Sequence, residues 1–264
     1  MVKVVHRVQP RTTRGERLLR SFGWKDGDAV MLVAESDAHW ESVAPAIRAN
    51  DLTDLMVHRK YTRAELDSAA WLDMSLWQTG YPQPEDGFAY KGLTYHDVCS
   101  RCGSKGEQRA PFCMAGEPRW GTRSIMSLHW EYDAVFVKPE VFDEVFEPLG
   151  FRSREVHDRR RSILKTVVQV EITERVPLDV RALKGRTCRA CGRRRFSPEV
   201  LGDRPRLLAP PTSDLSSSRE HFGEGLAYFA LTIASARLYR ALQAAKVRGA
   251  EFSVQRLSEA AEGT

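Results

Sequence analysis

The sequence lacks any long apolar segment. Its longest apolar-rich run, residues 226–236, is about half as long as the ~20 residues that a membrane-spanning helix needs. The opening residues, MVKVVHRV, contain no apolar stretch followed by a small-residue cleavage site, which argues against a secretory signal peptide. We therefore expect a soluble, cytoplasmic protein that has no membrane partner.

Sequence signatures of catalysis are also missing. There is no Gly-x-Ser-x-Gly elbow, no glycine-rich phosphate loop and no His-Glu-x-x-His motif. One enzymatic pattern remains, because zinc nucleobase deaminases combine His-x-Glu with Pro-Cys-x-x-Cys. His-Trp-Glu occurs at residues 39–41 and 129–131, ahead of the two Cys-x-x-Cys pairs, but Val98 and Thr187 stand where the proline belongs. A zinc-dependent deaminase is thus the weakest functional hypothesis. We expect no enzyme and assign no catalytic residue.

Cysteine is scarce, with five in 264 residues, yet four of them form two copies of one pattern. Knuckle 1 is Cys99-Ser-Arg-Cys102-Gly103, and knuckle 2 is Cys188-Arg-Ala-Cys191-Gly192. A Cys-x-x-Cys turn supplies two thiolates to a tetrahedral zinc ion, and the glycine that follows tolerates a positive φ. In a reducing cytoplasm, paired cysteines favour metal binding over disulfides. We therefore predict one structural zinc ion bound by Cys99, Cys102, Cys188 and Cys191.

The long interval between the knuckles does not argue against a shared site. Joining Cys102 to Cys188 closes a loop of 86 residues, which costs about 4 kcal/mol. A structural zinc site contributes on the order of 10–16 kcal/mol, so the metal outweighs the closure. The alternative is a Cys₃His site formed by His96, Cys113 and knuckle 1, with other partners for knuckle 2. Otherwise Cys113 is expected to be a buried, inert thiol.

The apolar fraction of 42% and the charged fraction of 28% are those of a globular protein, and the expected elements give an α+β class with mixed sheets. Residues 1–80 read as a small α/β unit, and residues 81–264 read as a zinc-knuckle domain stapled by the two-knuckle site. A loop rich in Gly and Pro at 80–87 is the expected boundary. In the N-terminal unit we expect strands at 2–8, 28–34 and 53–61, helices at 15–22 and 37–50, and a further helix capped by Thr62 and Glu65.

Two strand-helix-strand units are expected in the second domain. The first occupies 133–137, 139–149 and 151–156, and the second occupies 226–232, 234–246 and 250–254. Each follows one knuckle, so the domain could be an internal duplication, although such units are common enough to recur by chance. The polar segment 197–220, which includes Ser216-Ser-Ser218, is expected to be an exposed loop.

The net charge of +5 is concentrated around knuckle 2. Residues 181–206 alone carry a formal charge of +7, which leaves the remainder slightly acidic. Arg189, Arg193, Arg194 and Arg195 could grip phosphates, which makes a nucleic-acid-binding zinc-knuckle module the alternative function. However, Phe196 is the only aromatic residue there to stack on a base. The same arginines could meet an acidic protein partner or form a solvated face.

The two CxxCG knuckles and the final strand, helix and strand ending Gly249-Ala-Glu-Phe-Ser-Val254 resemble the double-CXXCG motif family of myxobacterial proteins. Members of that family are described as immunity proteins of contact-dependent toxin systems. The resemblance covers residues 99–257 and implies Cys99, Cys102, Cys188 and Cys191 as the matching positions. It also implies a non-enzymatic role, in which the protein binds and neutralises a cognate toxin. About 98 residues precede knuckle 1 here, more than in the family pattern, so the resemblance does not extend to the N-terminal unit.

Overall fold

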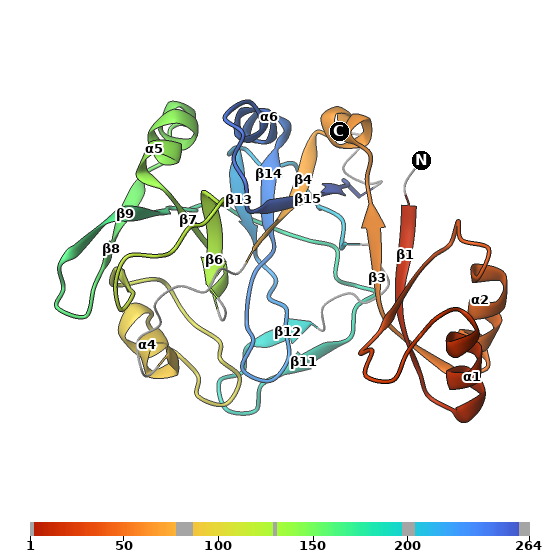
Figure 1. Cartoon of the computed structure of the whole chain (residues 1–264). Coiled ribbons are helices and arrows are strands. Elements are labelled where there is room, and N and C mark those ends of the chain that lie inside the picture. The colour runs from red at the N-terminus through yellow and green to blue at the C-terminus, as the bar shows by residue number, and fades with distance from the viewer. Residues whose placement is uncertain (1–2, 78–86, 129–130, 197–203, 259–264) are drawn as a thin grey trace. The chain divides into compact units, whose positions relative to one another are not determined.

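The computed structural model describes residues 3–77, 87–128, 131–196 and 204–258 and shows an α+β fold with several sheets (Figure 1). The chain divides into two compact units, with the boundary between Leu66 and Asp67. This boundary precedes the expected one because β4 (Trp71–Leu76) pairs with strands of the second unit. Residues 80–86 of the expected boundary loop lie outside the described residues. Within the described ranges, no helix is long and apolar enough to cross a membrane.

The first unit follows the sequence prediction closely. Its described elements are β1 (Lys3–Pro10), α1 (Thr13–Ser21), β2 (Met31–Ala34), α2 (Trp40–Arg48) and β3 (Leu52–Lys60). The strands pair antiparallel in the order β2-β1-β3, and apolar residues of the strands and of both helices form one core: Val8, Leu19, Val33, Val43 and Leu52. The predicted cap of α3 (Arg63–Ser68) is confirmed. The Thr62 amide donates to the Glu65 carboxylate at 2.8 Å, and the Glu65 amide donates to the Thr62 hydroxyl at 3.3 Å.

The second unit contains two larger sheets. The first sheet has the order β5-β8-β9-β7-β6 and the second has the order β10-β13-β14-β4-β15. The strands of the first are β5 (Phe112–Cys113), β6 (Ile125–Leu128), β7 (Glu131–Val137), β8 (Ser153–His157) and β9 (Ile163–Val170). Those of the second, besides β4, are β10 (Arg175–Val176), β13 (Leu215–Ser218), β14 (Thr232–Ser235) and β15 (Ala250–Gln255). A short hairpin, β11 (Gly185–Thr187) and β12 (Arg194–Phe196), carries knuckle 2, and α4 (Gly87–Thr94) precedes knuckle 1.

Both sheets contain a strand-helix-strand unit in which another strand separates the two parallel strands. In the first, β7 continues into the helical segment α5 (Pro139–Val141), η1 (Phe142–Phe146) and η2 (Glu147–Leu149) and then β8, with β9 between β7 and β8. In the second, β14 leads through α6 (Ala236–Ala244) to β15, with β4 between them. The two arrangements match, and the strand before each unit, β6 or β13, pairs antiparallel with β7 or β14. This likeness is what an internal duplication would produce, and the duplication stays a prediction.

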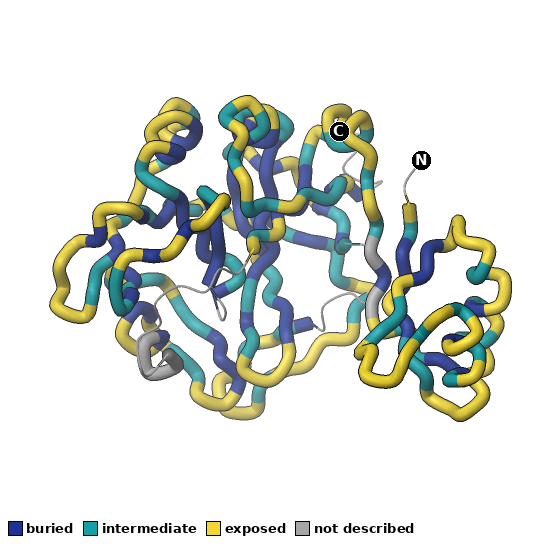
Figure 2. Tube along the Cα trace, viewed as in Figure 1, coloured by how far each residue is buried: buried dark blue, intermediate teal, exposed yellow. Residues whose placement is uncertain are grey.

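The core of the second unit joins the two strand-helix-strand units. One buried cluster contains Phe142 and Phe146 from the first helical segment together with Leu238 and Leu242 from α6. Figure 2 shows the buried stretches running through β6, β7, β13 and β14, where nearly every residue is inaccessible. The backbone just before β15 lies very close to the start of β6, because a Cβ on Gly249 would lie 2.1 Å from the Ile125 carbonyl oxygen.

Two sequence predictions for this unit are wrong. The serine run expected in an exposed loop forms β13, in which Ser216 and Ser218 are 0% exposed. Hydrogen bonds within the sheet pair the backbone groups of this buried strand. The Ser218 hydroxyl donates to the Glu220 carbonyl and accepts from the Leu231 amide, so it is also hydrogen-bonded although it is buried. The strand expected at 226–232 begins only at Thr232, because the preceding residues form a loop against knuckle 1.

Candidate metal centre

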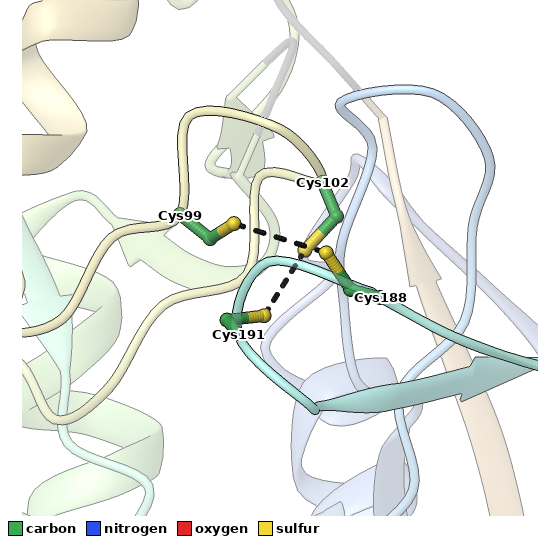
Figure 3. A group of neighbouring side chains, drawn as sticks. All are labelled: Cys99, Cys102, Cys188 and Cys191. Carbon is green, nitrogen blue, oxygen red and sulfur yellow. Dashed lines mark hydrogen bonds between the residues drawn. The ribbon is translucent and has the colours of Figure 1, made fainter.

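The four cysteines of the two knuckles come together although 86 residues of sequence separate them (Figure 3). The sulfur of Cys99 lies 4.0 Å from that of Cys188, and the sulfur of Cys102 lies 3.6 Å from that of Cys191. All four sulfur atoms lie within 4.8 Å of one another, and none forms a disulfide. A tetrahedron with Zn–S bonds of about 2.3 Å has edges of about 3.8 Å. The donor set and its dimensions therefore fit a four-coordinate metal ion such as zinc.

Each knuckle folds as the same turn. The amide of Cys99 donates to the Ser104 carbonyl, and the amide of Gly103 donates back to the Cys99 carbonyl, both at 2.8 Å. In knuckle 2, the Cys188 amide donates to the Arg193 carbonyl at 3.0 Å, and the Gly192 amide donates to the Cys188 carbonyl at 2.9 Å. The glycines have φ values of 70° and 73°, the left-handed region that their place in the motif predicts.

A loop of the second sheet packs directly on knuckle 1. A Cβ on Gly103 would lie 2.1 Å from the carbonyl oxygen of Leu226, so only glycine allows this approach. The loop turns at Gly223 and Gly225, whose φ values are 113° and 56°. Cys102 and Gly103 of knuckle 1 are thus buried, with Cys102 4% exposed, whereas Cys191 of knuckle 2 is exposed to solvent.

The four thiols differ in acidity because their surroundings differ. The Ser104 hydroxyl, 3.4 Å from the Cys191 sulfur, and the Arg193 amide lower the pKa of Cys191 to about 6. Backbone amides of residues 191 and 190 lower the pKa of Cys188. Burial raises the pKa of Cys102 to about 11. A divalent cation would favour all four thiolates, since metal binding displaces the thiol protons.

The predicted arginine patch divides into two pairs with different positions. The Arg193 guanidinium donates to the Asp97 carbonyl at 3.0 Å, which links knuckle 2 to the segment before knuckle 1. The Arg195 guanidinium donates to the carbonyls of Cys102 (3.2 Å), Gly225 (2.7 Å) and Ala227 (3.2 Å). These two arginines therefore hold the two knuckles and the loop together.

Arg189 and Arg194 remain at the surface. Both are exposed, and the Arg194 guanidinium lies over the Phe196 ring at 4.9 Å from its centroid. Of the four arginines predicted to bind a partner, these two are the exposed ones.

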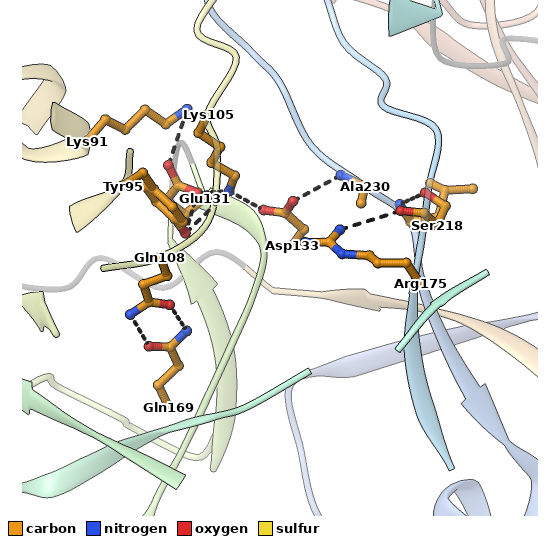
Figure 4. A network of polar contacts seen from close by, with 11 residues as sticks. Lys91, Tyr95, Lys105, Gln108, Glu131, Asp133, Gln169, Arg175, Ser218 and Ala230 are labelled. Carbon is orange, nitrogen blue, oxygen red and sulfur yellow. Dashed lines mark hydrogen bonds and ion pairs between the residues drawn. The ribbon is translucent and has the colours of Figure 1, made fainter. Parts of the chain in front are cut away.

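A buried network of charged side chains, which the sequence analysis missed, lies next to knuckle 1 (Figure 4). Glu131, 1% exposed, pairs with Lys91 at 3.2 Å and with Lys105, and Lys105 also contacts Asp133 at 2.7 Å. Two lysines thus neutralise two carboxylates. Burial acts to lower the pKa of Lys105, but the two carboxylates outweigh it and raise that pKa well above its ordinary value. Glu131 and Asp133 lie two residues apart on one strand and so share a face, which was the available signal.

The competing sites are not assembled. Within the described residues, the cysteine cluster contains neither His96 nor Cys113, and the Cys113 thiol instead lies 3.6 Å from the Met114 carbonyl. In the first His-Trp-Glu segment, His39 stacks on Phe22 at 4.1 Å between ring centroids. In the second, Glu131 belongs to the lysine network, and residues 129–130 lie outside the described ranges.

A comparison with protein-family models found no matching family, and a search of curated proteins found no matching protein.

Proposed function

We propose that this chain is a non-catalytic, zinc-stabilised binding protein that neutralises a protein partner, as an immunity protein neutralises its toxin. The observation that carries the proposal is the convergence of four cysteine sulfurs within 4.8 Å of one another. Four thiolates complete a tetrahedral coordination sphere and leave no position for water or substrate, which is the pattern of structural rather than catalytic zinc.

An exposed surface around knuckle 2 supports the binding role. We define the knuckle surface as Lys184, Arg186, Arg189, Arg194 and Leu226. All are exposed, and Leu226, 48% exposed, belongs to the loop that Arg195 holds against the knuckles. Clustered cations beside an apolar side chain favour an acidic protein, since complementary charges speed association and an apolar contact adds affinity.

The test is capture of the partner with a tagged chain from its own cells, with and without nuclease. We expect one stoichiometric protein that survives nuclease, and its expression alone should arrest growth that co-expression of this chain restores. Arg186→Glu with Arg189→Glu should weaken the complex at least tenfold. Arg240→Glu with Lys246→Glu, which reverses two exposed charges elsewhere in the second unit, should leave it unchanged. A partner that binds both double variants equally contradicts the proposed surface.

The second candidate is nucleic-acid binding, which the same exposed cations favour. In that case nucleic acid should co-purify, and its affinity should fall steeply as salt rises, because each phosphate contact releases counterions. The immunity role would be refuted if nucleic acid co-purified with the untreated chain and every protein band disappeared after nuclease treatment.

A further inference from the structure

The second unit contains a polar cavity that the zinc-knuckle function does not use. Its volume is about 380 Å³. Its walls are formed by residues 105–108, which follow knuckle 1, and by strands of both sheets. The polar lining residues are Tyr95, Lys105, Glu107, Gln108, Asp133, Arg154, Gln169, Glu171, Thr173, Arg175, Ser217 and His221. A dry, apolar cavity of about 150 Å³ admits benzene, so this space is large enough for a small metabolite. The polar walls disfavour a hydrocarbon ligand.

Most charges in the walls already have partners. Lys105 contacts Asp133 at 2.7 Å, and Arg154 donates to Glu171 at 2.5 Å. The amides of Gln108 and Gln169 form two reciprocal hydrogen bonds of 2.8 and 2.7 Å (Figure 4). These groups rigidify the walls without needing a ligand.

Among the described residues of the lining, Arg175 and the exposed Glu107 have no ion-pair partner, and Arg175 is the cation of the two. Its guanidinium makes one long hydrogen bond, 3.4 Å, to the Ser218 carbonyl. Across the described ranges, no carboxylate lies within 4.0 Å of it. Asp133 acts on Arg175 only at longer range. An arginine that forms a wall of a cavity and is in no ion pair is suited to a bidentate anionic group.

Two neutral donors lie in the same wall. Ser217 is 3% exposed, and its hydroxyl has no hydrogen-bond partner among the described residues. His221 stacks on Tyr228 at 4.3 Å between ring centroids.

The electrostatic surroundings of His221 are positive. Burial lowers the pKa of His221 to about 4; Asp133 opposes this shift, while Arg175, Lys105 and Arg193 add to it. Three cations and one carboxylate thus act on the ring, and His221 stays neutral at pH 7.

We propose that this cavity binds a small polar metabolite through a carboxylate or phosphate group, held by Arg175 with Ser217 and His221 as hydrogen-bond donors. This site is separate from the knuckle surface, and its occupancy does not depend on the proposed partner.

The experiment titrates the zinc-loaded full chain with inorganic phosphate and, separately, with acetate, at constant ionic strength balanced by chloride. The readout is the NMR signal of the His221 imidazole, assigned by its loss in His221→Gln. We expect a saturable shift with one anion or both, and the tighter of the two identifies the head group. Arg175→Gln should weaken this binding at least tenfold, and Ser217→Ala should weaken it severalfold. Arg240→Gln, which removes an exposed cation on α6, should not change it.

Three results would overturn the proposal. They are a shift that grows linearly without saturation, equal weakening by Arg175→Gln and Arg240→Gln, or full affinity in Arg175→Gln. Zinc content and the circular dichroism spectrum of each variant report folding, and Ser217→Ala gives a second reading should Arg175→Gln not fold. Failure here leaves partner capture untouched, so the two proposals are tested apart.

Discussion

Replacing Cys188 by serine removes one of the four sulfurs that meet between the knuckles. The matched control is Cys113→Ser, because Cys113 is the one cysteine of the chain outside the cluster and is half-buried in β5. Both changes exchange sulfur for oxygen in the same unit, but only the first removes a ligand. We expect one zinc ion per chain in the control and a strongly reduced content in Cys188→Ser.

The size of the effect follows from linkage. A ligand present at a thousandfold its dissociation constant stabilises the folded state by about 4 kcal/mol. Closing the 86-residue loop between the knuckles without a metal costs a similar amount, about 4 kcal/mol. For a chain of this size, 1 kcal/mol corresponds to roughly 2–4 °C, so we expect the Tm of the second unit to fall by roughly 8–16 °C.

The assay combines zinc analysis after dialysis against a weak chelator, thermal unfolding and amide hydrogen exchange. Loss of protection should be largest in both knuckles and in the loop at residues 223–228, which packs on Gly103. A Cys188→Ser protein that keeps one tightly bound zinc ion, or a control that loses its zinc equally, would refute the shared site. Loosening confined to knuckle 2 would show that the metal does not join the knuckles.

Three further predictions concern the surroundings of the metal. Arg195→Ala should lower the free energy of unfolding by about 2–4 kcal/mol in urea titrations, because it leaves three carbonyls without their charged donor. Arg194→Ala should lower it by less than about 1 kcal/mol, because the Arg194 side chain is exposed and only lies over the Phe196 ring. Equal losses would contradict the inference that Arg195 holds the loop against the knuckles. Glu131→Gln should lower the free energy of unfolding by about 3–5 kcal/mol, since it leaves two buried lysines with one carboxylate. A loss near zero would show that the network does not stabilise the fold. The pKa of His221 is about 4 when folded and ~6.5 when unfolded. The neutral ring therefore contributes fully to the stability of the folded state above pH 6.5, and this contribution is lost as the pH falls toward 4. Wild type should therefore lose up to about 3 kcal/mol relative to His221→Gln over that window, and parallel pH profiles of urea unfolding would refute the buried, neutral ring.

The sequence predicted the features that depend on short-range chemistry. Both knuckles were recognisable because the cysteine spacing and the following glycine are set within five residues, and the sulfur cluster agrees with the prediction. The Thr62–Glu65 cap is equally local. The strands and helices of the first unit were found because apolar residues recur with clear periods.

Features that depend on pairing between distant segments of the chain were not predicted. β9 and β4, the strands inserted between the parallel pairs, were not predicted, because nothing in a short segment says which sheet will receive it. The serine strand β13 has no apolar pattern, and only its neighbours in the sheet explain its burial. Similarly, the run Arg193-Arg194-Arg195 looks uniform in sequence, yet the fold turns two of its side chains toward backbone carbonyls and leaves the middle one exposed.

The position of β4 also has a consequence for the order in which the chain matures on the ribosome. Trp77, just after β4, donates from its indole to Glu251 at 3.1 Å, and the two residues are 174 positions apart. At ~5–20 residues per second, synthesis of that interval takes roughly 10–35 s. For most of this time, until β14 is made, β4 has neither of its neighbours, although it includes the apolar residues Leu72 and Met74. The three strands of the first unit's sheet all lie within residues 3–60, whereas the second sheet must wait for nearly the whole chain. A nascent chain stalled before β14 would expose an unpaired strand prone to aggregation.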